Sequence, residues 1–374
     1  MVDQAHFKPD GRPVNEQLAD LRVKIDSLDQ QLLDLLNQRA RLAQAVGEVK
    51  KLDGSPIFRP DREAQVIDRA KNRNPGPILN DSIAPIWREV MSACRALEAR
   101  QRVAFLGPVG TFTEQAMLNY FGSSIEPVAC VNIDEIFRAT ASGSADYGVI
   151  PIENSTEGVV GRSLDMLLQS RLTIIGETNL MITHNLLRKE PGRDGIKVVC
   201  AHPQALAQCQ NWLNTHLPGV ERRAVSSNAE GARLASEDPS IAGIASERAA
   251  SQFGVHVVDR GIQDEVHNRT RFVIITNVDQ HSPAAPTGHD CTSLGLSVAN
   301  RPGAVHDMLV PLKRHGVSMT RFESRPAKSG QWEYVFFIDL AGHPDQDNVA
   351  AAIAELRAQC SFFKVLGSYP LDVH

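Results

Sequence analysis

The sequence predicts a multidomain protein in which an all-helical region is followed by an α/β region and a small α+β unit. Apolar residues spaced by three and four dominate the first hundred residues, a pattern typical of amphipathic helices. Short apolar runs then alternate with helical segments, and the chain ends in a β-α-β-β-α-β order of elements. A chain of 374 residues is long enough for three domains. We expect them at residues 12–100, 102–278 and 290–370.

The composition excludes several classes of function. Hydrophobic residues make up 42% of the chain and charged residues 22%, as in ordinary globular proteins. The net charge of −5 argues against a nucleic-acid-binding protein. No stretch approaches the ~18 consecutive apolar residues of a membrane helix, and residues 1–15 lack a signal-peptide pattern, so we expect a cytoplasmic protein without membrane contacts. The six cysteines show no metal-binding spacing.

Three helices are expected in the first region: Leu18 to Lys51, Pro60 to Asn72 and Asn80 to Arg100. Breaks rich in Pro and Gly separate them. The first helix would be ~50 Å long at about 1.5 Å per residue, and three helices of these lengths cannot close a core alone. The sequence therefore predicts an intertwined dimer in this region.

The apolar face of the first helix carries two cations. Its apolar residues follow helical spacing and are Leu21, Ile25, Leu28, Leu32, Leu35, Leu42, Val46 and Val49. Arg39 falls within this stripe, and Lys50 lies about three turns, ~16 Å, farther along. An unpaired buried cation is costly, so it is normally neutralised by an ion pair or an anionic ligand. A carboxylate from a partner helix remains the structural alternative.

The third helix places an acid on an apolar face. Trp87, Met91, Cys94 and Glu98 step by four, three and four. Burial should raise the pKa of Glu98, so that its protonated form could donate a hydrogen bond. A glutamate at a frayed helix end, or one paired with Arg39 or Lys50, would explain the same pattern.

This region resembles the all-helical chorismate mutases. The resemblance rests on Leu21, Arg22, Ile25, Leu28, Asp29, Leu32, Leu33, Leu36, Arg39, Leu42, Val46, Gly47, Lys50, Pro56, Asp61, Arg62 and Glu63. It implies a dimer with two equivalent sites, in which Arg22 comes from the partner. It also implies that Arg39, Lys50, Arg62 and Glu63 of the same chain contact chorismate.

The chain departs from the usual pattern of these mutases at three positions of the site. Arg59 stands where an Asp is usual, and Cys94 and Glu98 stand where a Ser and a Gln are usual. Arg39, Lys50 and Glu98 are the expected catalytic residues. Lys50 and a protonated Glu98 would donate to the ether oxygen, where negative charge grows during the rearrangement.

The middle region reads as strands alternating with helices, which predicts a mostly parallel sheet or pair of sheets. The expected strands are Val103 to Leu106, Tyr147 to Ile152, Leu172 to Gly176, Val198 to Ala201, Ala242 to Ala245 and Phe272 to Thr276. Residues 107–113 form a strand-to-helix loop that could bind an anion, with Thr113 as the expected N-cap. Residues 151–158 and 268–272 are two further polar segments next to strands. The loops carry neither a Walker lysine nor a dinucleotide fingerprint, which excludes nucleotides.

Together these segments resemble the prephenate dehydratases over residues 102–277. The motifs are Gly-Pro-x-Gly-Thr-Phe-Thr, Pro-Ile-Glu-Asn-Ser-x-x-Gly, Ala-His-Pro-Gln-x-Leu and Asn-x-Thr-Arg-Phe. The resemblance implies a two-lobed fold like that of periplasmic binding proteins, with prephenate in the cleft. It makes Thr270 the essential residue, which we expect to donate to the leaving oxygen, with a relay from Glu153 or water. The prephenate-binding candidates are Thr111, Glu153, Asn154, Ser155, Gln208, Ser226, Asn268, Thr270 and Arg271; a structural role is an equal alternative for Arg271.

The C-terminal region follows a linker at residues 280–289 and resembles an ACT domain, a ferredoxin-like unit. Strands are expected at Thr292 to Ala299, Ser318 to Ser324 and Tyr334 to Leu340 and at the end of the chain, with helices from Gly303 and up to about Ala358. The resemblance implies binding of L-phenylalanine by two loops. The candidate residues are Asn300, Pro302, Gly303, Ala304, Val305, Glu323, Ser324 and Arg325.

The three resemblances together imply the bifunctional chorismate mutase/prephenate dehydratases of the bacterial P-protein type. Such an enzyme converts chorismate to prephenate and then to phenylpyruvate, without cofactor or metal, under feedback inhibition by L-phenylalanine. We expect a homodimer or a larger homo-oligomer. An arogenate-preferring dehydratase and a catalytically silent binding protein with an amino-acid sensor are the alternatives.

Overall fold

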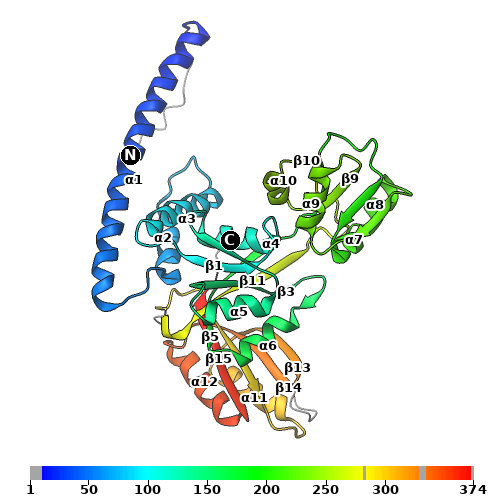
Figure 1. The fold of residues 1–374 in the computed structure, drawn as a ribbon. Helices are drawn as coiled ribbons and strands as arrows, with labels where there is room; N and C mark the ends of the chain where they lie inside the picture. The colour runs from blue at the N-terminus through cyan, green and yellow to red at the C-terminus, as the bar shows by residue number, and fades with distance from the viewer. Residues whose placement is uncertain (1–10, 281–283, 328–333, 372–374) are drawn as a thin grey trace.

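The computed structural model describes residues 11–280, 284–327 and 334–371 (Figure 1). Residues 1–10 and part of the predicted linker, residues 281–283, lie outside the described residues. The first region contains three helices, as predicted: α1 Val14–Asp53, α2 Pro60–Arg73 and α3 Asn80–Ala96. Gly54 ends α1 in the left-handed conformation with φ of +72°, which glycine adopts without steric cost. Helix α3 ends four residues before the expected Arg100, so Glu98 lies in the turn that follows it.

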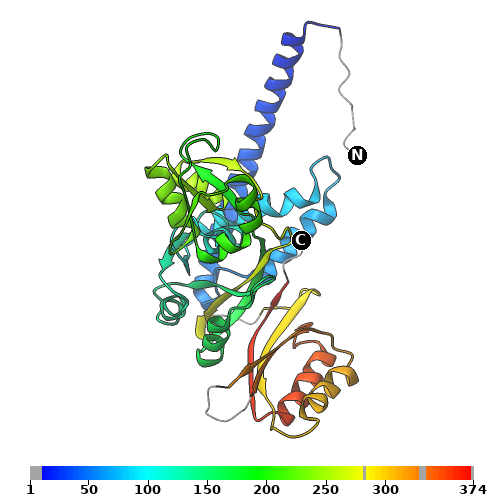
Figure 2. The same cartoon turned by 90° about the vertical axis from the view of Figure 1, so that its right-hand side faces the viewer.

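Helix α1 extends far beyond the rest of the molecule, and only its C-terminal part packs against α3 (Figures 1 and 2). Its apolar stripe is exposed in the single chain. Leu28 is 61% exposed, Leu35 62% and Leu42 69%. A free apolar face of this length is costly in water, which favours a partner surface that covers it.

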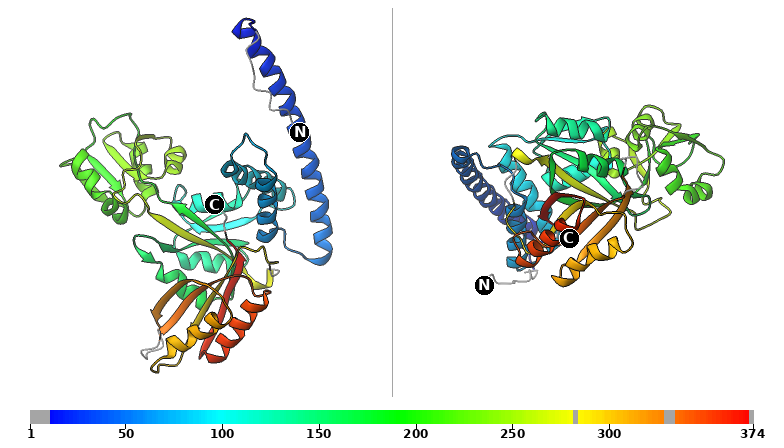
Figure 3. Two further views of the ribbon diagram at one scale, coloured as in Figure 1. Left: turned by 180° about the vertical axis from the view of Figure 1, so that it is seen from behind. Right: turned by 90° about the horizontal axis from the view of Figure 1, so that it is seen from below.

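The middle region forms two lobes, each built on one sheet (Figure 3). The first sheet has the order β2-β1-β3-β11-β5, with β4 added to β3. Its strands are β1 Arg102–Leu106, β2 Glu126–Cys130, β3 Tyr147–Asn154, β4 Gly158–Val159, β5 Leu172–Met181 and β11 Arg269–Asn277. Its helices are α4 Phe112–Phe121, α5 Ile133–Ala141 and α6 Gly161–Gln169.

The second lobe contains a sheet in the order β10-β6-β9-β7-β8. Its strands are β6 Asn185–Arg188, β7 Val198–Ala201, β8 Glu221–Ala224, β9 Ile241–Ala245 and β10 His256–Asp259. The helices around it are α7 Pro203–Gln208, α8 Gln210–His216, α9 Asn228–Glu237 and α10 Glu247–Phe253. The two-lobed architecture implied by the resemblance is confirmed.

Most strands of each sheet run in one direction, as expected, but both sheets also contain reversed strands that the sequence did not predict. Strands β1, β2 and β3 are parallel, but β11 runs antiparallel to both β3 and β5. In the second lobe β6 runs antiparallel to β9 and β10. The physical reason is that the chain crosses between the lobes twice, and each crossing inserts a strand of reversed direction into the sheet it enters.

The C-terminal unit has the predicted β-α-β-β-α-β order and an antiparallel sheet, β13-β14-β12-β15. Its elements are β12 Asp290–Ser297, α11 Ala304–Arg314, β13 Met319–Pro326, β14 Tyr334–Ala341, α12 Asp347–Gln359 and β15 Phe362–Pro370. Both helices lie on one face of the sheet (Figure 2). The other face packs on the first lobe, where Phe337, Leu366 and Tyr369 join its core.

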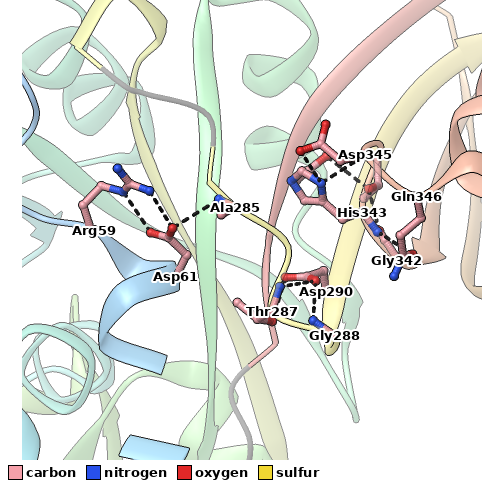
Figure 4. Close-up of polar contacts among 12 residues, drawn as sticks. Arg59, Asp61, Ala285, Thr287, Gly288, Asp290, Gly342, His343, Asp345 and Gln346 are labelled. Carbon is pink, nitrogen blue, oxygen red and sulfur yellow. Dashed lines mark hydrogen bonds and ion pairs between the residues drawn. The ribbon is translucent and has the colours of Figure 1, made fainter. Parts of the chain in front are cut away.

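The segment that leads from the middle region into the C-terminal unit is hydrogen-bonded at two places (Figure 4). The backbone N–H of Ala285 donates to Asp61 Oδ2 at 3.1 Å, at the start of α2. Asp290 accepts from the N–H groups of Thr287 and Gly288, at 2.8 and 3.0 Å. This part of the predicted linker therefore has a defined path into the C-terminal unit and is hydrogen-bonded to the first region. Over the described residues, no helix combines the length and apolarity needed to cross a membrane.

Candidate active sites

The first candidate site is a pocket of about 510 Å³ between α1, the start of α2 and the end of α3. Most of the predicted chorismate-binding residues line it: Arg39, Lys50, Arg59, Arg62, Glu63, Cys94 and Glu98. Arg22 does not. It is exposed on the projecting part of α1, seventeen residues and roughly 25 Å before Arg39 at about 1.5 Å per residue.

The two cations of the apolar stripe keep their charge available to this pocket. Arg39 Nη1 lies 2.9 Å from Cys94 Sγ, and Lys50 Nζ donates to the carbonyl oxygen of Ile57 at 2.9 Å. Among the described residues, no carboxylate forms an ion pair with either cation. Two positive side chains that face an open pocket and form no ion pair among the described residues provide a site for an anion.

Arg59 also lines this pocket, but its charge is paired with a carboxylate of the same chain. Its guanidinium binds both carboxylate oxygens of Asp61, at 2.7 and 3.0 Å. Burial opposes ionisation of Asp61, but the hydrogen bonds from Arg59 and from the Ala285 N–H outweigh it and lower the pKa of Asp61. Ala285 itself lines the pocket, so the connecting segment forms part of its wall.

The two glutamates of the pocket differ in their partners. Glu63 is bound by Arg95 from α3, although burial still raises the pKa of Glu63. Glu98 has one buried carboxylate oxygen, Oε2, without a hydrogen-bond partner among the described residues. It packs against Gly47 of α1, where any side chain would collide with it. Burial raises the pKa of Glu98 and outweighs the opposing charge of Lys50.

The second candidate site is a pocket of about 400 Å³ between the two lobes. Six of the predicted prephenate-binding residues line it: Thr111, Asn154, Gln208, Ser226, Asn268 and Thr270. They come from both lobes and from the segment between β10 and β11. The sequence therefore brings distant polar groups to one cleft.

Thr270 is held by a directed hydrogen bond. Asn154 Nδ2 donates to Thr270 Oγ1 at 2.9 Å, across the paired strands β3 and β11. The oxygen of the same amide accepts from the backbone N–H groups of Thr156 and Glu157, both at 3.0 Å. Because a backbone N–H can only donate, the orientation of the Asn154 amide is fixed. The hydroxyl of Thr270 is thus an acceptor toward Asn154, and its own proton is available to a ligand.

Three predicted residues do not reach this pocket. Glu153 pairs with Arg321 of the C-terminal unit at 2.9 Å, so it gives no relay to Thr270. Ser155 Oγ accepts from Arg269 N–H at 2.9 Å. Neighbouring strand residues point to opposite faces, which explains why Asn154 and Thr270 face the pocket while Glu153 and Arg271 face away.

Arg271 has the structural role that was the alternative to binding prephenate. It pairs with Glu177 and Asp339 at 2.5 and 2.6 Å, and donates to the hydroxyl of Tyr369 at 3.1 Å. Burial would lower the pKa of Arg271, but the charges around it raise that pKa. Arg271 therefore links the strand that carries Thr270 to the sheet of the C-terminal unit.

The strand-to-helix loop at residues 107–113 differs in one detail from the prediction. Thr111, not Thr113, is the N-cap of α4, and its Oγ1 accepts from the N–H of Glu114 at 3.4 Å. The N–H of Gly110 donates to the carboxylate of Glu114 at 2.7 Å. This loop therefore offers one fewer free donor to an anion than the sequence suggested.

Several residues that line the interlobe pocket were not among the candidates. They are Phe112, His184, His202, Gln204, Ser227, Asn228, Ser246 and Phe272, with other neighbours of these loops. His202 and Gln204 belong to the Ala-His-Pro-Gln motif, which was a usable signal. His184 follows a strand without any motif, so only the structure brings it to the pocket.

The predicted phenylalanine-binding loops lie in two separate pockets of the C-terminal unit. A pocket of about 220 Å³ is lined by Asn300, Gly303, Ala304 and Val305 of the predicted set. Another of about 470 Å³, against α6 of the first lobe, includes Arg325. Pro302, Glu323 and Ser324 line neither of these two pockets.

Comparison with known proteins joins these three regions. Family models for chorismate mutase type II, prephenate dehydratase and the ACT domain match residues 21–99, 103–280 and 292–358. A bifunctional chorismate mutase/prephenate dehydratase of Neisseria gonorrhoeae is 47% identical over 96% of this chain and 99% of its own length. The chain belongs to the bifunctional chorismate mutase/prephenate dehydratase family. A member from Pseudomonas aeruginosa is 45% identical over 96% of this chain and 99% of its own length.

The two lobes and the ACT domain of this family member are also similar to a solved structure. Prephenate dehydratase from Arthrobacter aurescens, in complex with L-Phe, is 34% identical. The match covers 72% of this chain and 89% of that one, with a TM-score of 0.66. The similarity places the interlobe pocket within the dehydratase part of the family and the 510 Å³ pocket within its mutase part.

Proposed function

We propose that the 510 Å³ pocket converts chorismate to prephenate and that the interlobe pocket converts prephenate to phenylpyruvate. The observation that carries the first assignment is the pair of cations, Arg39 and Lys50, facing an open pocket without a carboxylate partner. Chorismate is a small dicarboxylate, which such a pocket suits. The second assignment rests on Thr270, whose hydroxyl is oriented by Asn154 with its proton directed away from the network.

The rearrangement of chorismate breaks an ether C–O bond and forms a C–C bond within one molecule, so it requires no nucleophile. The site has to hold the substrate folded with its reacting carbons in contact. Arg39 and Arg62 provide planar donors for carboxylates. Lys50 and the protonated form of Glu98 donate to the ether oxygen as negative charge develops there.

Dehydration of prephenate expels a carboxylate as carbon dioxide and the ring hydroxyl as hydroxide, which takes a proton from solvent and becomes water. The electron pair of the breaking C–COO⁻ bond enters the ring, which becomes aromatic as the C–O bond breaks. The departing oxygen needs a hydrogen-bond donor. Thr270 provides it, since its Oγ1 already accepts from Asn154 and its O–H is left for the substrate.

We infer a homodimer in which the exposed stripe of α1 packs on a second copy. The stripe and the distance of Arg22 from its own pocket support this arrangement, because a second α1 could bring its Arg22 to that pocket. We also propose that the ACT domain binds L-phenylalanine and lowers dehydratase activity. The division of the predicted loops between two pockets supports a binding site completed by two copies.

Arg39→Ala tests the assignment of two separate sites. We expect mutase turnover to fall by roughly 100-fold or more, since a guanidinium that holds a substrate carboxylate in the reacting conformation is lost, while dehydratase activity on added prephenate stays at the wild-type level. Arg41→Ala is the matched control, because Arg41 projects about 200° away on the same helix at about 100° per residue. Equal mutase rates in Arg39→Ala and Arg41→Ala would remove Arg39 from the site.

A further inference from the structure

His184 lies at the hinge between the lobes of the dehydratase region. It belongs to the short segment that connects β5 of the first lobe to β6 of the second. Its side chain is 2% exposed and lines the interlobe pocket. The imidazole packs edge-on against Phe112, with ring centroids 5.6 Å apart. Burial of a histidine costs free energy because its ring nitrogens lose their hydrogen bonds to water, so hydrogen bonds within the protein should compensate.

A continuous hydrogen-bonded network connects His184 to Thr270. His184 Nε2 lies 2.9 Å from Gln208 Oε1, and Asn268 Nδ2 donates to the same oxygen at 3.2 Å. Asn268 Oδ1 in turn accepts from Asn154 Nδ2 at 2.8 Å. That amide nitrogen also donates to Thr270 Oγ1. Three amide side chains therefore link the imidazole to the hydroxyl.

The direction of every bond in this network follows from its Asn154 end. Backbone N–H groups fix the oxygen of Asn154, so its nitrogen must face Asn268 and Thr270. Asn268 then presents its oxygen to Asn154 and its nitrogen to Gln208. The Gln208 oxygen can only accept, so His184 must donate from Nε2.

The other ring nitrogen is consistent with this tautomer. Nδ1 of His184 is buried and has no hydrogen-bond partner in the described part of the chain. Protonation there would leave an unpaired charged N–H inside the protein. Burial accordingly lowers the pKa of His184, although the bond to Gln208 opposes the shift. The ring is therefore neutral at neutral pH, with its proton on Nε2.

The network spans the two lobes. Asn154 and Thr270 belong to the first sheet, and Gln208 ends α7 of the second lobe. His184 and Asn268 lie on the two crossing segments, which are themselves joined by the Ile182 N–H bond to the Asn268 carbonyl at 2.8 Å. The network thus connects residues of both lobes to Thr270.

We propose that His184 is a positioning residue of the dehydratase, which anchors Gln208 and, through Asn268 and Asn154, directs the hydroxyl proton of Thr270 toward the substrate. The proposal rests on the proposed dehydratase function. It gives His184 a role in turnover rather than in substrate affinity, because the imidazole acts through three intervening amides.

Paired variants at residue 184 separate this role from simple packing. His184→Leu removes the Nε2 donor, and we expect kcat on prephenate to fall about tenfold with KM changed less than about twofold. His184→Gln places an amide N–H at a similar reach and should recover most of the lost kcat. Mutase turnover in the same preparations reports whether each chain is folded and should equal that of the wild type.

Gln208→Leu tests the same network without altering the buried histidine. Its kcat should also fall about tenfold, and the double variant His184→Leu/Gln208→Leu should be no slower than either single one, because both remove one connected unit. An unchanged kcat in His184→Leu or fully additive losses in the double variant would overturn the proposal. Failure of the wild type itself to form phenylpyruvate would instead overturn the proposed function.

Discussion

The mutase and dehydratase pockets represent two different ways of building a site for similar small anions. The mutase pocket presents formal charges, Arg39 and Lys50, from helices whose apolar face is still uncovered. The dehydratase pocket presents neutral amides and hydroxyls that bind one another in a fixed direction, and it is enclosed by two lobes of one chain. In the proposed dimer a second copy completes the first site with its Arg22, whereas the residues that line the second pocket all come from one chain.

This difference predicts that the two activities respond differently to solution conditions and to substitutions. A charge-based pocket at a subunit contact should depend on protein concentration, salt and pH, because charges are screened and subunits dissociate. A network of neutral hydrogen bonds should instead depend on the identity of single side chains. The predictions below sharpen this contrast, from the largest expected effect to the smallest.

Thr270→Ala should separate the two sites most strongly. Loss of the donor to the departing oxygen should lower phenylpyruvate formation by roughly 100- to 1,000-fold. Mutase turnover should stay near the wild-type level, since Thr270 is remote from that pocket. Stopped assays with prephenate and chorismate measure the two rates. Thr270→Ser, which keeps a hydroxyl, and Ser155→Ala, which lies outside the pocket, are the controls.

Leu32→Asp should disrupt the mutase site through the uncovered face of α1. A charge on the interface destabilises helix association, so we expect a smaller particle in sedimentation and a loss of mutase activity of roughly 100-fold, with the dehydratase largely retained. Asn37→Asp adds the same charge to the opposite side of the helix and should change neither. A Leu32→Asp protein with wild-type size and mutase rate would contradict the dimer.

Glu98→Gln should alter the pH dependence of the mutase. Burial raises the pKa of Glu98, and only the protonated form can donate to the ether oxygen. Wild-type mutase activity should therefore be highest below that pKa and decline as pH rises through it. The amide of glutamine donates at every pH, so the variant should show a flat profile. A profile identical to the wild type would exclude Glu98 from the mechanism.

Asp339→Ala should report on the contact between the dehydratase strand and the ACT sheet. It leaves the buried Arg271 without one of its two carboxylates, which should lower the free energy of unfolding by about 3 kcal/mol. Urea unfolding followed by circular dichroism measures this loss. Glu247→Ala removes an exposed pair with Arg260 in the second lobe and should cost less than about 1 kcal/mol.

The sequence predicted the elements that carry strong apolar patterns and missed those that do not. Strand β8 was not predicted because all four of its residues are exposed at a sheet edge. Its sequence therefore lacks the alternation of apolar and polar residues that marks a half-buried strand. The reversed direction of β11 depends on the second crossing between lobes, which no local pattern encodes. The three helices of the first region were located because apolar residues spaced by three and four mark them and Pro- and Gly-rich segments separate them.

Some candidate site residues were predicted correctly and others were not, because a motif does not show which way each side chain points. Motifs identified Thr270 and Asn154, but they could not show that the adjacent Arg271 and Glu153 face the ACT sheet, because both faces of a strand carry polar residues here. Likewise, the sequence did not show that Arg59 pairs with Asp61, which also accepts from the backbone N–H of Ala285 in the connecting segment. Which cation is free and which is paired is a property of the packed chain.

The most direct test of two complete activities in one chain is a time course with purified wild-type protein and chorismate alone. Prephenate should appear first and phenylpyruvate after it, without added metal or nucleotide, and L-phenylalanine should slow the second step. A protein that leaves chorismate unchanged, or accumulates prephenate without any phenylpyruvate, would contradict the account.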